Sequence, residues 1–287
     1  MTVLPHRVPR PTARASGRAR TGSALLTAFT YLVAFAFFFP LLWTVLTAFK
    51  TEADAAAQPP IFLFHFTLTN FHTALSGSYF SFFKNSMILS IGSTALALAL
   101  GLPAAYSLAF HPTKRTPAVL SWVLSTKMLP LVAAVVPLLV IYKRVGLFDS
   151  RLGMVLLYGA FNLPLVIWMM RSFFADLPRE ILEAGTVDGA GVGRIMRSIV
   201  LPLTVPGLAA TALLSLIFSW NEFLLAVNLT GAKTGTLPVY ISGFMTSEGL
   251  FWAKMSAAST IAVAPVVLAG WLAQRSLVRG LTFGAVK

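Results

Sequence analysis

The sequence contains no cysteine and few charged residues, and each of these features excludes a class of protein. Without cysteine there is no disulfide framework, no thiolate metal site and no cysteine nucleophile. Only 11% of the 287 residues are charged and 57% are hydrophobic, which is too apolar for an ordinary soluble domain. The composition therefore indicates a membrane protein that crosses the bilayer several times.

Catalytic and nucleotide-binding motifs are missing too. There is no H-E-x-x-H pair for zinc and no G-x-S-x-G nucleophile elbow, and the four histidines are dispersed. The string Gly231–Gly235 comes nearest to a phosphate-binding loop, but it lacks the Gly-Lys-Ser/Thr step and the spacing that precedes it. We therefore expect no catalytic residue, no metal and no cofactor in this chain, and we interpret residues 231–235 as an external turn.

Acidic residues are scarce, with 9 against 22 basic ones, so the net charge is +13. A nucleic-acid site would need the basic residues gathered on a soluble surface, whereas here they are scattered beside apolar stretches. We therefore expect no nucleic-acid partner. The arginines of residues 1–22 lie in a Pro/Ala/Ser-rich stretch without apolar periodicity, which predicts a disordered cytoplasmic tail with some attraction to anionic lipid.

Six apolar stretches are long enough to cross a bilayer, since a spanning helix needs about 20 mostly apolar residues. The first is longer than the apolar core of a cleaved signal peptide, so we expect it to be retained. The sequence thus predicts an all-α membrane protein with one six-span domain over residues 23–280 and a short C-terminal tail at 281–287. The predicted spans are 23–49, 85–110, 118–142, 152–170, 205–229 and 255–274.

The distribution of basic residues predicts the orientation of these spans. Six spans place both termini on the same side as the polar segment between the fourth and fifth spans. That side carries 14 Lys and Arg residues and the other side 7, with Lys127 inside a span. The positive-inside rule therefore places both termini and this segment in the cytoplasm. The three basic residues between the third and fourth spans are locally discordant.

The polar segment itself carries a spaced pattern. Pro178 can open a short helix, glycines can turn the chain after it, and residues 194–200 can form a second short helix before Pro202. Glu183-Ala184, Gly189, Ile199 and Leu201-Pro202 then fall at the spacing of the EAA loop, and this pattern resembles that of binding-protein-dependent ABC importer permeases.

The resemblance extends from about Ser23 to the C-terminus. Gly185 departs from it, because the family usually has a second alanine there, and we expect the glycine to loosen the first helix by about 0.5–1 kcal/mol without removing a contact group.

What the resemblance implies is a coupling role for this EAA loop, residues 178–202. In the family it docks into a cleft on a separate ATPase subunit, which binds ATP and Mg²⁺ and does the hydrolysis, so this chain would be a non-catalytic subunit. The residues expected to make or permit this contact are Glu183, Ala184, Gly185, Asp188, Gly189, Gly191 and Arg194.

Within the family the chain looks most like the second permease subunit of carbohydrate importers, the maltose, trehalose and polyol group. This implies a bacterial inner-membrane complex with a second permease, two ATPase subunits and an extracytoplasmic solute-binding protein, and a sugar or polyol as solute. Residues 284–287 would approach the ATPase pair, with a frayed tail as the alternative.

Polar residues inside the predicted spans are candidates for the solute path. Ionised side chains there cost about 2.5–3.5 kcal/mol each unless they are paired or hydrated. Lys127 could line the path, snorkel or form a structural ion pair, and a pair with Glu222 is one hypothesis. Asn221 and Glu222 could line the path or form hydrogen bonds between helices. Asn162 is a further candidate, with Asn85 and Tyr158 as weaker ones.

Two other classes of function remain open from the residues alone. A secondary transporter driven by an ion gradient could use Lys127 and Glu222 for coupling, and it would need no EAA loop. An intramembrane enzyme is a more distant alternative.

Overall fold

The chain folds almost entirely into helices. The computed structural model describes the backbone of residues 17–247 and 249–283 and the side chains of residues 25–247 and 249–274. The tail predicted over residues 1–22 lies partly outside the described residues, and in the described part a helix already begins at Gly17. Residues 284–287, expected to approach the ATPase pair, also lie outside them.

Four helices are long and apolar enough to cross a membrane unaided, and the number rises to six if each of two sharply bent helix pairs crosses as one span. These four begin earlier or end later than the spans predicted from the sequence. They are α1 (Gly17–Ala48), α4 (Tyr79–Phe110), α7 (Arg151–Ala175) and α14 (Trp252–Phe283).

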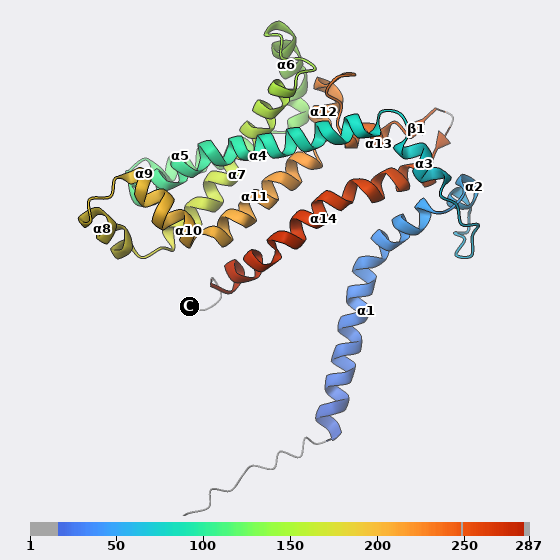
Figure 1. Ribbon diagram of the computed structural model, residues 1–287, viewed down its shortest axis with the longest axis horizontal. Coiled ribbons are helices and arrows are strands. Elements are labelled where there is room, and N and C mark those ends of the chain that lie inside the picture. The colour runs from blue at the N-terminus through green and yellow to red at the C-terminus, as the bar shows by residue number, and fades with distance from the viewer. Residues whose placement is uncertain (1–16, 248, 284–287) are drawn as a thin grey trace, which may run out of the picture.

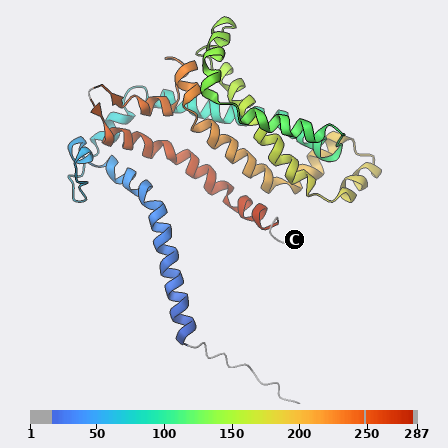
Figure 2. The ribbon, with the colours of Figure 1, turned by 180° about the vertical axis from the view of Figure 1, so that it is seen from behind.

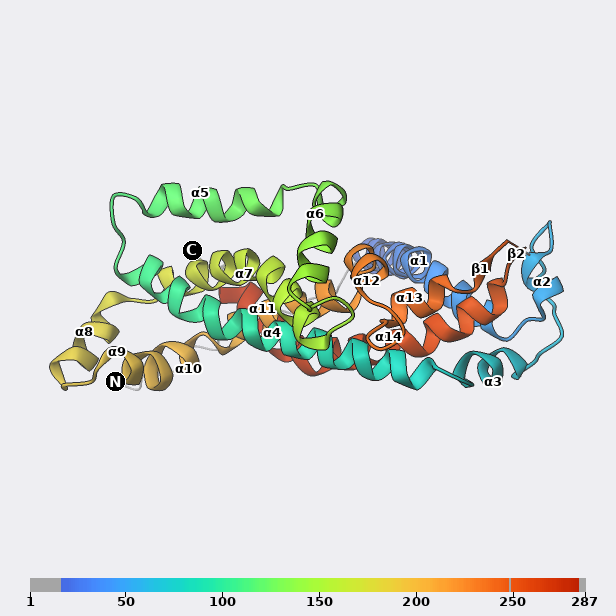
Figure 3. The ribbon, with the colours of Figure 1, turned by 90° about the horizontal axis from the view of Figure 1, so that it is seen from above.

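The third predicted span, residues 118–142, is not one continuous helix. It divides into α5 (Thr116–Lys127) and α6 (Leu131–Arg144), which meet at 86°. Pro130 lies in the break; it has no backbone N–H to donate, and it disfavours helical geometry at Leu129. Figure 3 shows α6 turned away from the direction of α5.

The fifth predicted span, residues 205–229, is broken as well. Its first part is α11 (Val205–Trp220) and its second is the short α12 (Leu224–Leu229), with residues 221–223 between them. At its start, α11 is bent by 84° from the preceding helical segment Val192–Leu203. The third and fifth predicted spans are therefore each divided into two helices. The breaks are only about three residues long, and hydropathy averaged over a long window does not detect them.

The remaining elements gather at the two ends of the long helices. Figures 1 and 3 show α8–α10 at one end and α2, α3, α13 and the β1–β2 hairpin at the other. The bounds of these elements are α2 Glu52–Ala56, α3 Thr69–Leu75, α8 Arg179–Val187, α9 Val192–Ile195, η1 Met196–Val200, α10 Leu201–Leu203, α13 Leu237–Ser242, β1 Met245–Thr246 and β2 Gly249–Leu250.

The core lies where α4 packs along α7, with α11 against both. By contrast, α1 diverges from the other helices and contacts chiefly α14, as Figures 1 and 2 show from opposite sides. Its outward part is apolar all round, and such a helix must lie in lipid or against another protein. The exposed side chains there include Leu25, Leu26, Phe29, Leu32, Phe35, Phe38 and Leu41.

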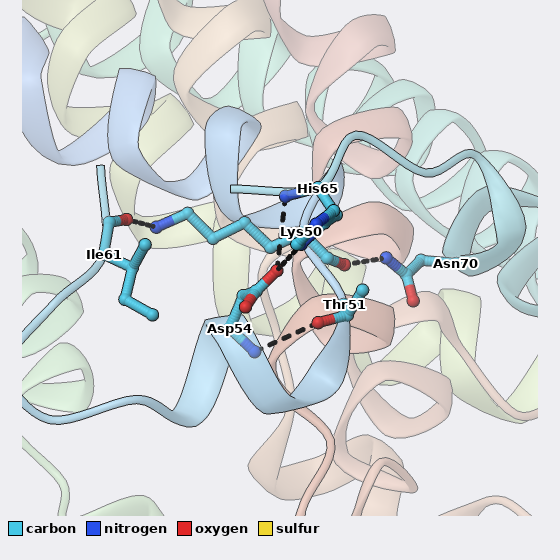
Figure 4. Close-up of polar contacts among 6 residues, drawn as sticks. All are labelled: Lys50, Thr51, Asp54, Ile61, His65 and Asn70. Atoms are coloured by element: carbon cyan, nitrogen blue, oxygen red, sulfur yellow. Dashed lines mark hydrogen bonds and ion pairs between the residues drawn. The ribbon is translucent and has the colours of Figure 1, made fainter. Parts of the chain in front are cut away.

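Polar contacts fix the chain where α1 ends. The buried Lys50 donates from Nζ to the carbonyl oxygen of Ile61 at 2.6 Å and lies 4.0 Å from the centroid of the Trp43 ring. Burial lowers the pKa of Lys50, and the nearby Asp54 carboxylate partly offsets this. Asn70 donates to the Lys50 carbonyl at 2.6 Å (Figure 4). The loop after α1 is therefore held by a buried lysine whose ammonium lies over the rings of Trp43 and Phe64, and we call these contacts the Lys50 clamp.

Next to this site, Glu52 joins the α1 end of the chain to α14. Its two carboxylate oxygens accept hydrogen bonds from the backbone N–H groups of Ala253 and Lys254, each at 3.0 Å. These are unpaired donors in the first turn of α14, so the carboxylate caps that helix and favours its dipole.

Another set of polar contacts, which we call the Asp149 clamp, surrounds the carboxylate of Asp149 in the loop between α6 and α7. Its carboxylate accepts from the backbone N–H groups of Gly231, Lys233 and Thr234 at 2.8, 3.2 and 3.0 Å, and from the Thr234 hydroxyl at 2.6 Å. The string that looked like a phosphate loop thus wraps around a carboxylate of its own chain. Asn85 holds the same loop by donating to the carbonyls of Lys233 and Gly235, each at 3.0 Å.

Replacing Asp149 by Ala should destabilise the fold, because three backbone donors lose their acceptor. We expect a loss of about 1–3 kcal/mol, seen as a lower melting temperature of the detergent-solubilised protein. Asp176→Ala is the matched control, since Asp176 is exposed and its carboxylate has no hydrogen bond among the described residues. Equal melting temperatures for the two variants would contradict the clamp.

The same clamp predicts a pH dependence. Burial alone would raise the pKa of Asp149, but the hydrogen bonds from Thr234, Gly231 and Lys233 outweigh it and hold the pKa below its ordinary value of 3.8. The stabilisation is therefore complete above that value and is lost as the pH falls below it. Melting curves recorded down to acid pH should show the wild type converging on Asp149→Ala, and a constant gap would contradict this.

Candidate functional site

The EAA loop forms two short helices joined by a tight turn. Pro178 precedes α8, which ends at Val187, and a continuous helical segment runs from Val192 to Leu203 through α9, η1 and α10. Gly189 sits in the turn with φ +76°, a conformation that costs other residues roughly 1–2 kcal/mol. The helix, turn and helix expected from the sequence are therefore present, with the second helix starting earlier than residue 194.

The two helices of the loop pack on each other and on the bundle. Gly185 is buried in the interface, and a Cβ added there would lie 2.9 Å from Cδ1 of Ile199. Ile195 and Val200 belong to a buried cluster that includes Met170 and Phe174 of α7. Gly185, which departs from the family pattern, therefore leaves room for Ile199. The loop is attached to the end of the bundle by its own core.

The outer surface of the loop carries charged side chains without partners among the described residues. The side chains of Glu183, Asp188 and Arg194 are exposed, and within the described part of the chain they make no ion pair or side-chain hydrogen bond. Val187 at the tip is 87% exposed. Of the seven residues expected at the contact, only Gly185 is buried and the other six are exposed. A rigid surface with free charges and an exposed apolar tip is suited to binding another protein.

The intramembrane candidates form a second constellation. Lys127, Asn162 and Glu222 line one cavity of about 270 Å³, together with Tyr158. It lies beside both helix breaks, because Lys127 ends α5 and Glu222 follows α11. Asn221 lines a different cavity, beside α13 and α14, and its amide donates to the Ile217 carbonyl at 2.9 Å. The structure thus brings three of the four candidates together.

The Glu222 carboxylate is fully engaged by its own chain. It accepts from the Tyr158 hydroxyl at 2.9 Å and from the backbone N–H groups of Leu225 and Ala226 at 2.8 and 3.0 Å. These two donors start α12, so Glu222 satisfies the helix end that the break exposes. Lys127 forms no ion pair with it, and its ammonium lies 5.5 Å from the centroid of the Phe218 ring. The hypothesised Lys127–Glu222 pair is therefore wrong for this conformation.

Asn162 joins three helices rather than standing free. Its amide nitrogen donates to the Ser219 hydroxyl at 2.7 Å, and Ser219 shares a hydrogen bond of 2.8 Å with Ser93. Interhelical hydrogen bonds of this kind hold membrane helices together. Sequence reasoning missed the two serines, although their presence in apolar stretches was a usable signal. It also grouped Asn85 with the path, whereas the Asn85 amide holds the loop of residues 231–235.

The packing at Gly185 and the turn at Gly189 predict different responses to alanine. Gly185→Ala gains about 1 kcal/mol of helix propensity but displaces the flexible end of Ile199, so we expect a stability change within about 1 kcal/mol. Gly189→Ala should cost roughly 1–2 kcal/mol, because the backbone at this position is left-handed. Melting temperatures of the two variants should rank accordingly, and the reverse order would contradict the packing described.

Comparisons with known proteins agree with this arrangement. The chain is 36% identical over 277 residues to a probable ABC transporter permease of Sinorhizobium fredii, covering 96% of this chain and all of that one. It is 35% identical over 260 residues to the trehalose transport system permease protein SugB of Mycobacterium tuberculosis, covering 86% and 92%.

In fold, the chain resembles a subunit of a bacterial ABC transporter involved in the import of the acidic polysaccharide alginate, with a TM-score of 0.73 at 20% identity over 93% of this chain and all of that one. Residues 97–282 match the family described as the inner membrane component of binding-protein-dependent transport systems. The chain is therefore a member of the binding-protein-dependent ABC importer permease family.

Proposed function

We propose that this chain is a membrane subunit of an ATP-driven importer for a sugar or sugar alcohol, and that the EAA loop transmits the work of a separate ATPase. The observation that carries the proposal is the surface of that loop. Three charged side chains and an apolar tip are free on a segment whose own core is packed on α7. Such a segment can transmit a force from a bound partner to the helices without changing its own conformation.

In the proposed topology the bent pair α5–α6 counts as one span and residues 205–229, with α11 and α12, count as another, which makes six. The EAA loop then lies in the cytoplasm with both termini. The excess of basic residues on that side supports this orientation. The arrangement in Figure 1 supports it too, because α8–α10 and α2–α3 lie at opposite ends of the long helices. The membrane is then the bacterial inner membrane.

The EAA loop and the exposed surface of α1 indicate which partners the chain would bind. ATP and Mg²⁺ would be bound by a pair of ATPase subunits beneath the EAA loop, and a binding protein would deliver the solute from outside. The exposed apolar surface of α1 would face lipid or a second permease. Assembly with a binding protein is supported by the neighbouring alginate transporter, which is described in complex with a periplasmic protein carrying an alginate pentasaccharide.

The solute class is supported by the relatives and by the cavity. Relatives at 35% and 32% identity are described as permeases for trehalose and for trehalose and maltose. The cavity with Lys127, Asn162 and Glu222 combines polar groups with the rings of Phe161 and Phe218, a mixture that suits sugars. We assign these three residues to the wall of the solute path, with Asn221 facing a neighbouring cavity.

A charge reversal on α8 tests the coupling. Glu183→Lys should lower ATP-driven uptake by the reconstituted complex about tenfold or more, since a repelled charge at a protein contact costs on the order of 1–3 kcal/mol. Asp176→Lys is the control, because Asp176 is also exposed and changes the charge by the same amount but precedes the EAA loop. Uptake would be measured with labelled trehalose in proteoliposomes.

The two variants change the net charge equally, so solubility and assembly effects should be shared. Full uptake by Glu183→Lys, or an equal loss in both variants, would show that the motif face of α8 does not carry the coupling.

A further inference from the structure

The loop after α1 exposes a cluster of apolar side chains. Phe62, Leu63, Phe66 and Leu68 are all exposed, Leu63 by 94% of its surface. In residues 61–68, which we call the apolar loop, His65 is the one residue with an ionisable side chain. Contiguous apolar surface that is poor in charge marks a site for another protein or for a membrane.

We propose that the apolar loop is a membrane anchor, which dips into the lipid leaflet at the C-terminal end of α1. Phe62, Leu63 and Phe66 then lie among the acyl chains just below the phospholipid headgroups. In the topology proposed above this is the extracytoplasmic leaflet. The surface is therefore covered by phospholipid, and not by the solute or by a partner protein.

The depth of the loop is set by aromatic contacts with α1. Ring centroids lie 6.0 Å apart for Phe35 and Phe39, 6.0 Å for Phe39 and Trp43, and 5.2 Å for Trp43 and Phe62. Trp43 lies about 8 Å along the axis before the last residue of α1. The loop thus folds back beside the last turns of a helix that is apolar enough to cross a membrane, at the level where aromatic side chains gather in membrane proteins.

The Lys50 clamp makes this depth tolerable for the backbone. A carbonyl carried into the bilayer has no water to serve it and needs a donor from the protein. The Lys50 ammonium donates to the Ile61 carbonyl at 2.6 Å (Figure 4) and lies 4.0 and 5.1 Å from the ring centroids of Trp43 and Phe64. A long basic side chain that reaches along apolar surface is suited to this boundary.

Backbone contacts with the end of α1 hold both ends of the loop. The Asn70 amide donates to the carbonyls of Ala48 and Lys50 at 2.9 and 2.6 Å, and the Thr67 N–H donates to the Phe49 carbonyl at 2.9 Å. The last carbonyls of a helix have no partner within it, so these bonds cap α1. The apolar side chains are therefore presented outward by a closed loop.

The charges near the loop favour lipid over a charged protein surface. Asp54 accepts from the His65 backbone N–H at 3.4 Å and lies 3.9 Å from its imidazole (Figure 4). Glu52 is occupied by the first turn of α14. These are the two carboxylates of residues 50–70. Both already have partners in this chain, so neither is left to attract a basic partner.

The absence of cysteine from the chain makes a direct test available. Leu63→Cys places a thiol in the apolar loop, and Ala232→Cys places one on an exposed polar turn as control. Each variant would carry a bimane fluorophore in the assembled importer, reconstituted in phosphatidylcholine nanodiscs with and without binding protein. The two quenchers are iodide in the water and a phosphatidylcholine spin-labelled near the headgroup end of its acyl chain.

We expect the spin-labelled lipid to quench the fluorophore at position 63 and iodide to quench the one at position 232, with loss of each effect at the other position. Adding Lys50→Met to Leu63→Cys should weaken quenching by the lipid, because the Ile61 carbonyl loses its donor and draws the loop toward water. Lys50→Arg should retain it. Size-exclusion chromatography of the assembled complex shows whether each variant folds.

Each other result would contradict part of the inference. Iodide quenching at position 63 equal to that at 232 would place the loop in water and overturn the anchor. Protection from both quenchers would mean that a protein covers the loop: the second permease if no binding protein is needed, and the binding protein if it is. Lipid quenching unchanged by Lys50→Met would overturn the role of Lys50. The measurement needs no transport, so the proposed function is tested separately by uptake.

Discussion

The membrane part of this protein depends on the need of every buried backbone donor for an acceptor. Within a bilayer no water is present to serve an interrupted helix, so a break must be closed by the protein itself. The carboxylate of Glu222 does this between α11 and α12, where it accepts from two backbone N–H groups and from the Tyr158 hydroxyl. With the donors satisfied, the chain can turn and leave a cavity beside the break.

The two clamps and the EAA loop are stabilised in different ways, and the difference matches their proposed tasks. In the Lys50 and Asp149 clamps, single polar side chains hold several loops together through backbone groups. The EAA loop is held by an apolar core, and its charged side chains Glu183, Asp188 and Arg194 make no hydrogen bond or ion pair among the described residues. Loops whose polar groups are all hydrogen-bonded to one another tend to move as one unit. A packed loop with unpaired charged side chains on its surface is suited to binding a partner protein. An ion-coupled mechanism would need Glu222 to exchange its partners, and the contacts of Glu222 give that no support.

Much of this could be predicted from the sequence, and the failures have physical causes. Length and hydropathy locate the apolar stretches, and the prolines and glycines of residues 178–202 predict the two short helices with a turn between them, because both signals are local. The breaks at residues 128–130 and 221–223 were missed, since hydropathy averaged over about 20 residues hides a proline or a capping carboxylate. Asp149 could not be matched with residues 231–234, because that contact depends on how two distant loops meet. The role of Gly185 depended likewise on where Ile199 lies.

The central claim is that this chain moves solute only when a separate ATPase drives it through the EAA loop. The most direct measurement is uptake of labelled trehalose into proteoliposomes that contain both permeases and the binding protein, with the ATPase subunits present or omitted. The account predicts uptake only with the ATPase subunits and ATP, and none from a proton or sodium gradient alone. Uptake driven by such a gradient without the ATPase subunits would contradict it.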